Sequence, residues 1–311
     1  MRQFLLRRLI QSALLLWVLM SFTFLLVRLT PGGPEAAFLE QPNIDKAEIE
    51  RMRERFGLND PLPVAYVKWI TSAVRFDFGR SYFYLRPPTE VIQQRLWPSI
   101  QLGAAAYLIA LLGIPLGVYA ALHRGKLPDV LVRVFTVLGD ATPTWWTALV
   151  IIVILSTTIG WFPQGLGRDG PLDWLKHIVI PAVILGLGGL VAFTRYVRSQ
   201  VLEVMGHDHV RTARAKGLVE FAVVNRHVLR NALLPVVTLM GSLLPALFSG
   251  AALTEQIFNW PGMGRLYVEA AFTRDYPLLL AIITLLTIAT LIGTLMADLL
   301  YGIVDPRIRY S

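Results

Sequence analysis

The residues whose types and spacing could carry chemistry gather in one basic segment, 208–235. Its charges are five cations and two acids: Arg211, Arg214, Lys216, Arg226 and Arg230 against Asp208 and Glu220. Gly217 divides the segment into two parts with helical apolar spacing. We therefore predict a short helix, a glycine turn and a second helix at an angle, a form suited to docking on a soluble partner.

The two predicted helices each have a small apolar face. Val210 and Ala213 form it before the glycine, whereas Val224, Val228 and Leu229 form it afterwards. We expect any side chain at position 217 to strain the turn if its backbone φ is positive.

The rest of the sequence contains no pattern that predicts catalysis. The Gly125-Lys126 pair lacks the earlier glycine and the following Ser or Thr of a phosphate-binding loop. No Ser/His/Asp set, metal cluster or carboxylate pair stands out, and the chain contains no cysteine. We therefore expect a non-catalytic subunit that binds no cofactor or metal.

The composition is typical of a membrane protein. Hydrophobic residues make up 55% of the 311 residues and charged residues only 16%, against about 25% charged residues in soluble domains. The net charge of +8 could indicate nucleic-acid binding, but the cations lie at the ends of long apolar runs. Membrane orientation explains that placement better.

Six apolar runs are long enough to predict an all-α polytopic membrane protein with six transmembrane helices. They lie at about 9–27, 100–122, 131–158, 178–193, 233–253 and 275–301. The first run follows three arginines, but it is too long for a typical signal peptide and no cleavage site follows it. Within the second run, Gly113 and Gly117 favour close helix approach, and Pro115 favours a kink.

The polar stretch between the first two runs predicts a folded helical cap on the outer face. Helical spacing occurs at 45–56 and 64–76, and Thr89 could cap a third helix that ends at Pro98. We therefore divide the chain into 1–98, the first span with this cap, and 99–311, a five-helix core with a cytoplasmic loop at about 200–232. Receiving a binding protein and simple packing over the span ends are both open roles for the cap.

The distribution of cations predicts the orientation in the membrane. The segments assigned to the cytoplasm hold 15 Lys and Arg, whereas the two short outer loops hold 4. The long first loop is left out because long loops cross the membrane regardless of charge. The bias predicts cytoplasmic N- and C-termini.

Asp140 is the one acid in the middle of the third apolar run. A charge in lipid is costly, so we expect its side chain to face protein or water. It could line a polar path through the membrane, or it could serve a structural role beside a polar group such as Thr142. Both interpretations stay open.

The basic segment resembles the cytoplasmic coupling loop of ABC importer permeases. The general pattern of that loop is Glu-Ala-Ala, three residues, Gly and a later Leu-Pro; this chain has Arg211-Thr212-Ala213, Gly217 and Leu234-Pro235. The replaced Glu and the more distant Leu-Pro are similar to the peptide-importer branch, as are WPGMGRL and the closing DLLYGIVDPRIR. The family usually has a small or apolar residue at the position of Asp140, so this aspartate is a departure. Under the resemblance, the path interpretation is that Asp140 lines the translocation path and meets a peptide amine.

The resemblance covers nearly the whole chain and implies the type I ABC importer permease fold. It implies a permease of the dipeptide, oligopeptide and nickel group in a bacterial or archaeal plasma membrane. The implied partners are a homologous second permease, two ABC ATPase subunits that bind ATP and Mg, and an extracytoplasmic substrate-binding protein. The implied coupling residues are Arg211, Thr212, Ala213, Arg214, Lys216, Gly217 and Leu218.

Three alternatives to an ATP-driven peptide importer stay open at this point. The same architecture could import nickel complexes or another small oligomer. An ion-coupled secondary transporter would be expected to carry several charges within its spans and often an inverted repeat. A scaffold or receptor without transport would leave the loop and the helix-breaking prolines unexplained.

Overall fold

The computed structural model describes residues 2–29, 59–161, 165–167, 170–233, 236 and 251–304. Over these residues the regular elements are helices. The helices before the basic segment are α1 (Arg2–Leu29), α4 (Leu62–Val74), α5 (Pro88–Leu111), α6 (Gly113–Leu122), α7 (Leu127–Ala141), α8 (Thr144–Thr158) and α9 (Pro171–Met205). Those from the basic segment onward are α10 (Asp208–Ala215), α11 (Glu220–Ala222), the π-helix η1 (Val223–Leu229), α12 (Arg230–Ala232), α15 (Ala252–Ile257), α16 (Met263–Phe272) and α17 (Tyr276–Val304).

Among the residues that the structure describes, four helical stretches are long and apolar enough to cross a membrane. They are Arg7–Leu29, Pro88–Leu122, Pro171–Met205 and Tyr276–Met296, and the bent pair α7–α8 brings the number to five if it is one span. The predicted fifth span, 233–253, lies mostly outside the described residues, as do the predicted helix at 45–56 and the C-terminal tail. The polytopic helical fold is thus confirmed, and the number of six spans stays a prediction.

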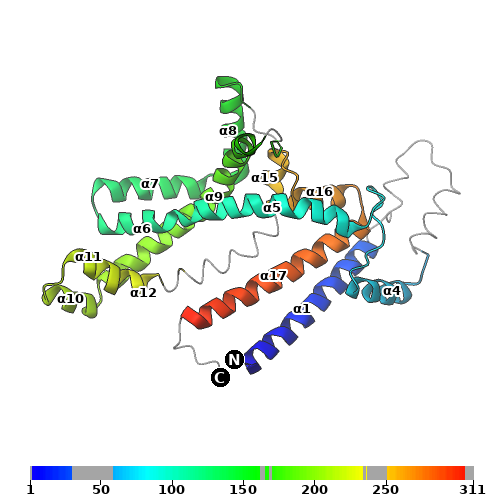
Figure 1. Ribbon diagram of the computed structural model, residues 1–311, viewed down its shortest axis with the longest axis horizontal. Coiled ribbons are helices and arrows are strands. Elements are labelled where there is room, and N and C mark those ends of the chain that lie inside the picture. The colour runs from blue at the N-terminus through cyan, green and yellow to red at the C-terminus, as the bar shows by residue number, and fades with distance from the viewer. Residues whose placement is uncertain are drawn as a thin grey trace.

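The core of the molecule is the long helix α9 packed along α5 and α6 (Figure 1). Small residues permit the close approach that the sequence predicts for this region. A Cβ on Gly117 would lie 2.6 Å from the carbonyl oxygen of Thr194, and one on Gly186 would lie 2.5 Å from that of Ala106. Backbones this close leave no room for larger side chains, so the three helices pack as a tight unit.

The helix predicted to end at Pro98 does not end there. Instead, α5 runs from Pro88 through the buried Pro98 to Leu111, and Thr89 does not cap it, because the N-cap residue is Pro87. The break comes at Leu112, where α6 begins. Pro115 has no N–H to donate to the Leu111 carbonyl, so this proline causes the break between α5 and α6. The boundary between residues 98 and 99 therefore falls inside a helix.

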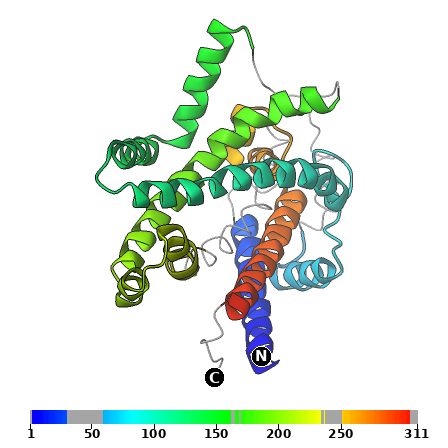
Figure 2. The same cartoon turned by 60° about the vertical axis from the view of Figure 1, so that its left-hand side comes forward.

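The third apolar run is not one straight helix. It is divided into α7 and α8, which meet at 100°. Thr142 is extended, with φ −97° and ψ 123°, as expected for a residue that precedes a proline. Figures 1 and 2 both show α8 projecting away from the body formed by α5, α6 and α9.

The two terminal long helices, α1 and α17, pack side by side (Figure 1). The segment between α4 and α5 is joined to the turn between α16 and α17. The Ser81 hydroxyl donates a hydrogen bond to the buried Asp275 carboxylate, and the Tyr84 hydroxyl donates to Glu269 Oε1 at 2.9 Å. These bonds tie the predicted outer cap to the last predicted outer loop. In the first loop, the prediction for 64–76 corresponds to α4.

Candidate functional site

The basic segment folds as a helical hairpin at one end of the molecule, shown at the left of Figure 1. The hairpin consists of α10, a turn around Gly217, and the run α11–η1–α12. This arrangement confirms the predicted pair of helices, although the seven-residue π-helix η1 was not predicted. The helix α9 continues to Met205, past the predicted start of the loop at about residue 200. Arg195 and Arg198 lie within this helix.

Gly217 ends α10 in a left-handed conformation, with φ of +75°. The Gly217 N–H donates to the Arg214 carbonyl at 2.9 Å, and the Leu218 N–H donates to the Ala213 carbonyl at 3.4 Å. This pair of bonds is the Schellman motif, in which glycine avoids the steric cost of a Cβ. A Cβ here would contact nothing within 4 Å, so the strain expected from a side chain comes from the backbone alone, about 1–2 kcal/mol.

An ion pair closes the turn. Arg214 Nη2 lies 2.5 Å from Glu220 Oε1, and Arg214 Nε donates to Glu220 Oε2 at 3.1 Å. These two hydrogen bonds lower the pKa of the Glu220 carboxyl. Arg214, one of the coupling residues that the resemblance implies, is therefore engaged within the hairpin.

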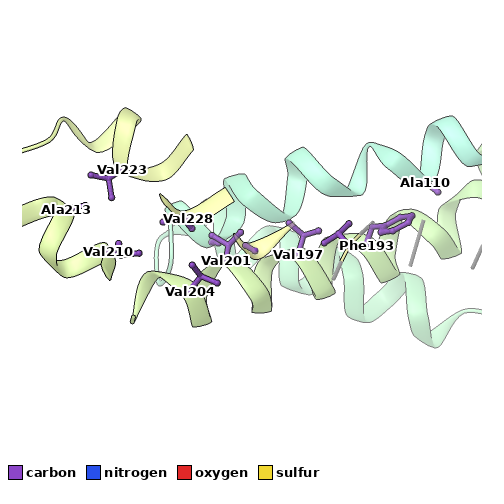
Figure 3. Packing of buried hydrophobic residues seen from close by; sticks show 12 residues of the cluster. Ala110, Phe193, Val197, Val201, Val204, Val210, Ala213, Val223 and Val228 are labelled. Atoms are coloured by element: carbon purple, nitrogen blue, oxygen red, sulfur yellow. The ribbon is translucent and has the colours of Figure 1, made fainter. Parts of the chain in front are cut away.

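The hairpin is fixed to α9 by a continuous apolar seam (Figure 3). Val210 and Ala213 from α10 are buried, as are Val223 and Val228 from η1. They pack against the C-terminal half of α9, and the cluster continues to Ala110 of α5 and Ala121 of α6. The cluster members from α9 are Phe193, Val197, Val201 and Val204. The hairpin and the core helices therefore share one cluster of buried apolar side chains.

Ala213 differs from the other predicted coupling residues because it faces inward. It is 5% exposed, whereas the other six residues of that set, named above from Arg211 to Leu218, are exposed. Bulk at position 213 would therefore push α10 away from η1, and would not meet a partner directly. Leu234-Pro235, the last part of the motif, lies outside the described residues.

The outward face of the hairpin carries apolar side chains that no part of the described chain covers. Leu218 is 44% exposed, Val219 70% and Phe221 80%. Exposed basic residues flank them: Arg211, Lys216, Arg226 and Arg230. An apolar tip within a basic surface is suited to a protein partner with an apolar groove and an acidic rim.

A buried ion pair that the sequence did not predict joins α9 to the first turn of α7. Arg198 Nε donates to Asp129 Oδ1 at 2.6 Å, and Arg198 Nη2 donates to Oδ2 at 3.0 Å. The Asp129 side chain is 1% exposed and also accepts the Gly125 N–H at 3.0 Å. The only signal in the sequence is that two opposite charges flank apolar runs, and their pairing depends on how the helices pack.

Asp140 forms a second ion pair between α7 and α9. Arg195 Nη1 donates to Asp140 Oδ2 at 2.9 Å, and Arg195 Nη2 donates to Oδ1 at 3.1 Å. Thr142 is not its partner, because the Thr142 hydroxyl donates to the Leu138 carbonyl at 3.0 Å. Both interpretations of Asp140, as a path residue or as a structural residue, had missed the arginine.

At the opposite end of the chain's core, a buried carboxylate organises the predicted loop around WPGMG. The Glu255 side chain accepts a hydrogen bond from the Ser99 hydroxyl at 2.8 Å and one from the Arg265 N–H at 2.8 Å. It thereby caps the N-terminus of α16, whose own N-cap residue is Gly262. A Cβ at Gly262 would lie 2.3 Å from Glu255 Oε1, so this glycine makes room for the carboxyl.

Burial raises the pKa of the Glu255 carboxyl, while the hydrogen bonds from Arg265 and Ser99 act in the opposite direction. The folded chain then binds the proton more tightly than the unfolded chain does. The free energy of unfolding should therefore fall as the pH rises above the ordinary glutamate pKa of 4.5. The melting temperature should therefore fall as the pH rises above 4.5, and we expect Glu255→Gln to weaken this fall.

The matched control is Glu203→Gln, which removes an exposed carboxylate from α9. Its melting temperature should follow that of the unaltered protein across the same pH range. An identical pH profile for all three proteins would show that Glu255 does not titrate in this way.

The long apolar helices define a multi-pass membrane protein, and the basic hairpin is packed firmly against them. Two family models match the chain and identify its family. The model for the binding-protein-dependent transport system inner membrane component matches residues 113–310. A second model, for the N-terminal part of such membrane components, matches residues 1–85. The chain therefore belongs to this family, the membrane permease subunits of ABC importers, in which ATP hydrolysis occurs in separate subunits.

Relatives in two bacteria match the full length of the chain. It is 38% identical over 317 residues to the oligopeptide transport system permease protein AppB of Bacillus subtilis, covering 100% of both chains. It is also 38% identical over 321 residues to a putative peptide permease protein of Brucella ovis, again covering 100% of both.

Two solved structures show the same fold. A chain of the MetNI methionine ABC transporter in an inward-facing conformation superposes with a TM-score of 0.54 at 17% identity, covering 70% of this chain and 97% of that chain. An amino acid ABC transporter solved with histidines gives a TM-score of 0.51 at 15% identity, covering 71% and 95%. The expectation of a type I ABC importer permease fold is thereby confirmed.

Proposed function

We propose that this permease moves peptides across the plasma membrane by alternating access, driven by ATPase subunits that grip the hairpin 208–232. The observation that carries this proposal is the two-sided hairpin. Its inward face is locked onto α9 by Val210, Ala213 and Val228, while its outward face presents exposed apolar and basic side chains. Such an element transmits a push from outside to the membrane helices.

The mechanical step follows from the packing. An ATPase dimer that closes on ATP and opens after hydrolysis would displace the hairpin. Because the apolar seam continues through α9 to α5 and α6, these helices would move with it as a rigid unit. ATP binding would favour one state of the permease through differential contact with the hairpin, without touching the substrate.

Peptides are the proposed substrate because the full-length relatives in Bacillus subtilis and Brucella ovis are named as peptide permeases. The proposed assembly pairs this chain with a homologous permease, two ATPase subunits that bind ATP and Mg, and an extracytoplasmic binding protein. The cation distribution supports cytoplasmic termini and a cytoplasmic hairpin.

The direct test is uptake of a labelled peptide by the complete complex in proteoliposomes. We expect uptake to require ATP on the hairpin side and the binding protein on the other side. Uptake that follows an imposed ion gradient without ATP would favour a secondary transporter and contradict the proposal.

The exposed tip gives a more local prediction. Phe221→Ser should leave folding unchanged, because the side chain is 80% exposed, but it should weaken ATPase binding about tenfold or more if Phe221 fills the partner's groove. Titration of the detergent-solubilised permease with the ATPase subunit measures this.

The matched control is Phe272→Ser. Phe272 is 86% exposed and lies at the end of α16, away from the hairpin. This variant should bind the ATPase as the unaltered protein does. If the ATPase binds both variants with equal affinity, Phe221 does not contact the ATPase.

A further inference from the structure

Two aspartates of α7 each hold an arginine of α9, and the two pairs differ in accessibility. The Asp129 and Arg198 side chains are 1% and 22% exposed, whereas those of Asp140 and Arg195 are 56% and 49% exposed. The first pair is also held by the Gly125 N–H and approached by Arg133 at 3.7 Å. Only the second pair leaves both charged groups within reach of a molecule that approaches from outside the chain.

Large apolar side chains close to Asp140 in sequence are exposed as well. Val137 and Leu138, on the same turn of α7, are each 61% exposed, and Trp145 and Trp146 beyond the bend are about half exposed. Both α7 and α9 belong to segments apolar enough to lie in a membrane. A charged pair exposed to lipid is costly, so this side of the chain must face water or protein. A water-filled path between two permeases meets that requirement.

The chemistry of the pair matches a molecule that carries both charges. The guanidinium of Arg195 presents two parallel N–H groups, the geometry that binds a carboxylate in a bidentate manner. The Asp140 carboxylate accepts hydrogen bonds from an ammonium group. A peptide with a free amino end and a free carboxyl end could therefore open the pair and leave neither charge unpaired.

The geometry points to Asp140 and Arg195 as a substrate site in the translocation path: Arg195 takes the α-carboxylate of the peptide and Asp140 takes its α-ammonium group. Between substrates, the two side chains close on each other as the structure shows. This inference rests on the proposed function, since it assigns the charge recognition within the same path. It also gives Asp140 a role in selectivity that a small or apolar residue could not perform.

The test compares three peptides of one sequence in the complete complex: one with free ends, one N-acetylated and one C-amidated. For each peptide, uptake by a variant is divided by uptake by the unaltered protein, which cancels the selection made by the binding protein. We expect Asp140→Asn to lower uptake of peptides with a free amine about tenfold, the size of a lost charge-assisted hydrogen bond, and to spare the acetylated peptide. Arg195→Gln should do the same for peptides with a free carboxylate and spare the amidated one.

The control is Asp129→Asn, which removes the acid of the buried pair on the same two helices. It should lower uptake of all three peptides by one common factor, because it acts through structure. If Asp140→Asn lowers uptake of all three peptides by one factor, and Arg195→Gln does the same, the assignment is overturned.

A zwitterionic lipid headgroup carries the same two kinds of charge and is the competing occupant. Repeating the comparison in bilayers of anionic lipid alone, with no zwitterionic lipid, separates the two sources. Variant effects that disappear in those bilayers would assign the pair to lipid and overturn the proposal, whereas effects that persist and follow the peptide's end groups support it. If the unaltered complex shows no ATP-dependent uptake, the proposed function itself fails, and that outcome is distinct from a failure of the ion-pair site.

Discussion

Ala213→Trp should abolish ATP-driven uptake while the permease still inserts into the membrane. Ala213 is 5% exposed and packs among Val210, Val223 and Val228. An indole there cannot be accommodated, so α10 must move away from η1 and the docking face loses its shape. We expect peptide uptake near background, with ATP hydrolysis no longer stimulated by the loaded binding protein.

Ala215→Trp is the matched control for this prediction. Ala215 lies in the last turn of the same helix and is exposed, so a large side chain there disturbs no internal packing. If uptake falls equally in both variants, then bulk on the surface blocks the partner and the inward packing of Ala213 is not the cause. Normal uptake by Ala213→Trp would contradict the role of the seam.

Arg198→Ala should destabilise the folded permease by about 3 kcal/mol, the lower end of the range for breaking a buried ion pair. The reason is that Asp129, 1% exposed, would keep its charge without the two hydrogen bonds from Arg198. Replacing both Asp129 and Arg198 should lower the free energy of unfolding less than replacing Arg198 alone, because no unpaired buried charge remains. Thermal or denaturant unfolding in detergent measures both effects.

The comparison variant for this pair is Arg195→Ala. Its ion pair is about half exposed on both sides, and exposed pairs contribute roughly 0–1 kcal/mol. A loss of stability as large as that of Arg198→Ala would show that exposure does not separate the two pairs, and would weaken the case for Asp140 and Arg195 as an accessible site.

The parts of the fold that the sequence predicted are those set by local pattern. Helical spacing around Val210, Ala213, Val224 and Val228 predicted the hairpin, and Gly217 predicted its turn. Hydropathy predicted the positions of α1, α5–α6, α9 and α17. These signals need only neighbouring residues, so they could be read without knowing how the helices pack.

The errors lie where a proline acts in context. Pro98 was expected to end a helix, yet α5 continues through it, because the helix is buried between neighbours at that point. Pro143, in contrast, bends the third apolar run by 100°. The rule that a proline ends or bends a helix thus failed at Pro98 and held at Pro143, and tertiary packing decided the outcome.

The partners in the candidate site could not be predicted, since they join residues far apart in the chain. Arg195 with Asp140, Arg198 with Asp129, and Glu255 with Ser99 each pair across different helices. The inward orientation of Ala213 also depends on how α10 meets η1. Single-sequence patterns carry no information on which face meets which helix.

The most direct test of the whole account uses the absence of native cysteine. Val219→Cys places one thiol on the outward face of the hairpin, at a position 70% exposed. We expect a membrane-impermeant thiol reagent to label it in inverted vesicles but not in right-side-out vesicles, and we expect bound ATPase to protect it. Labelling from the outer side, or labelling unchanged when the ATPase is bound, would contradict the account.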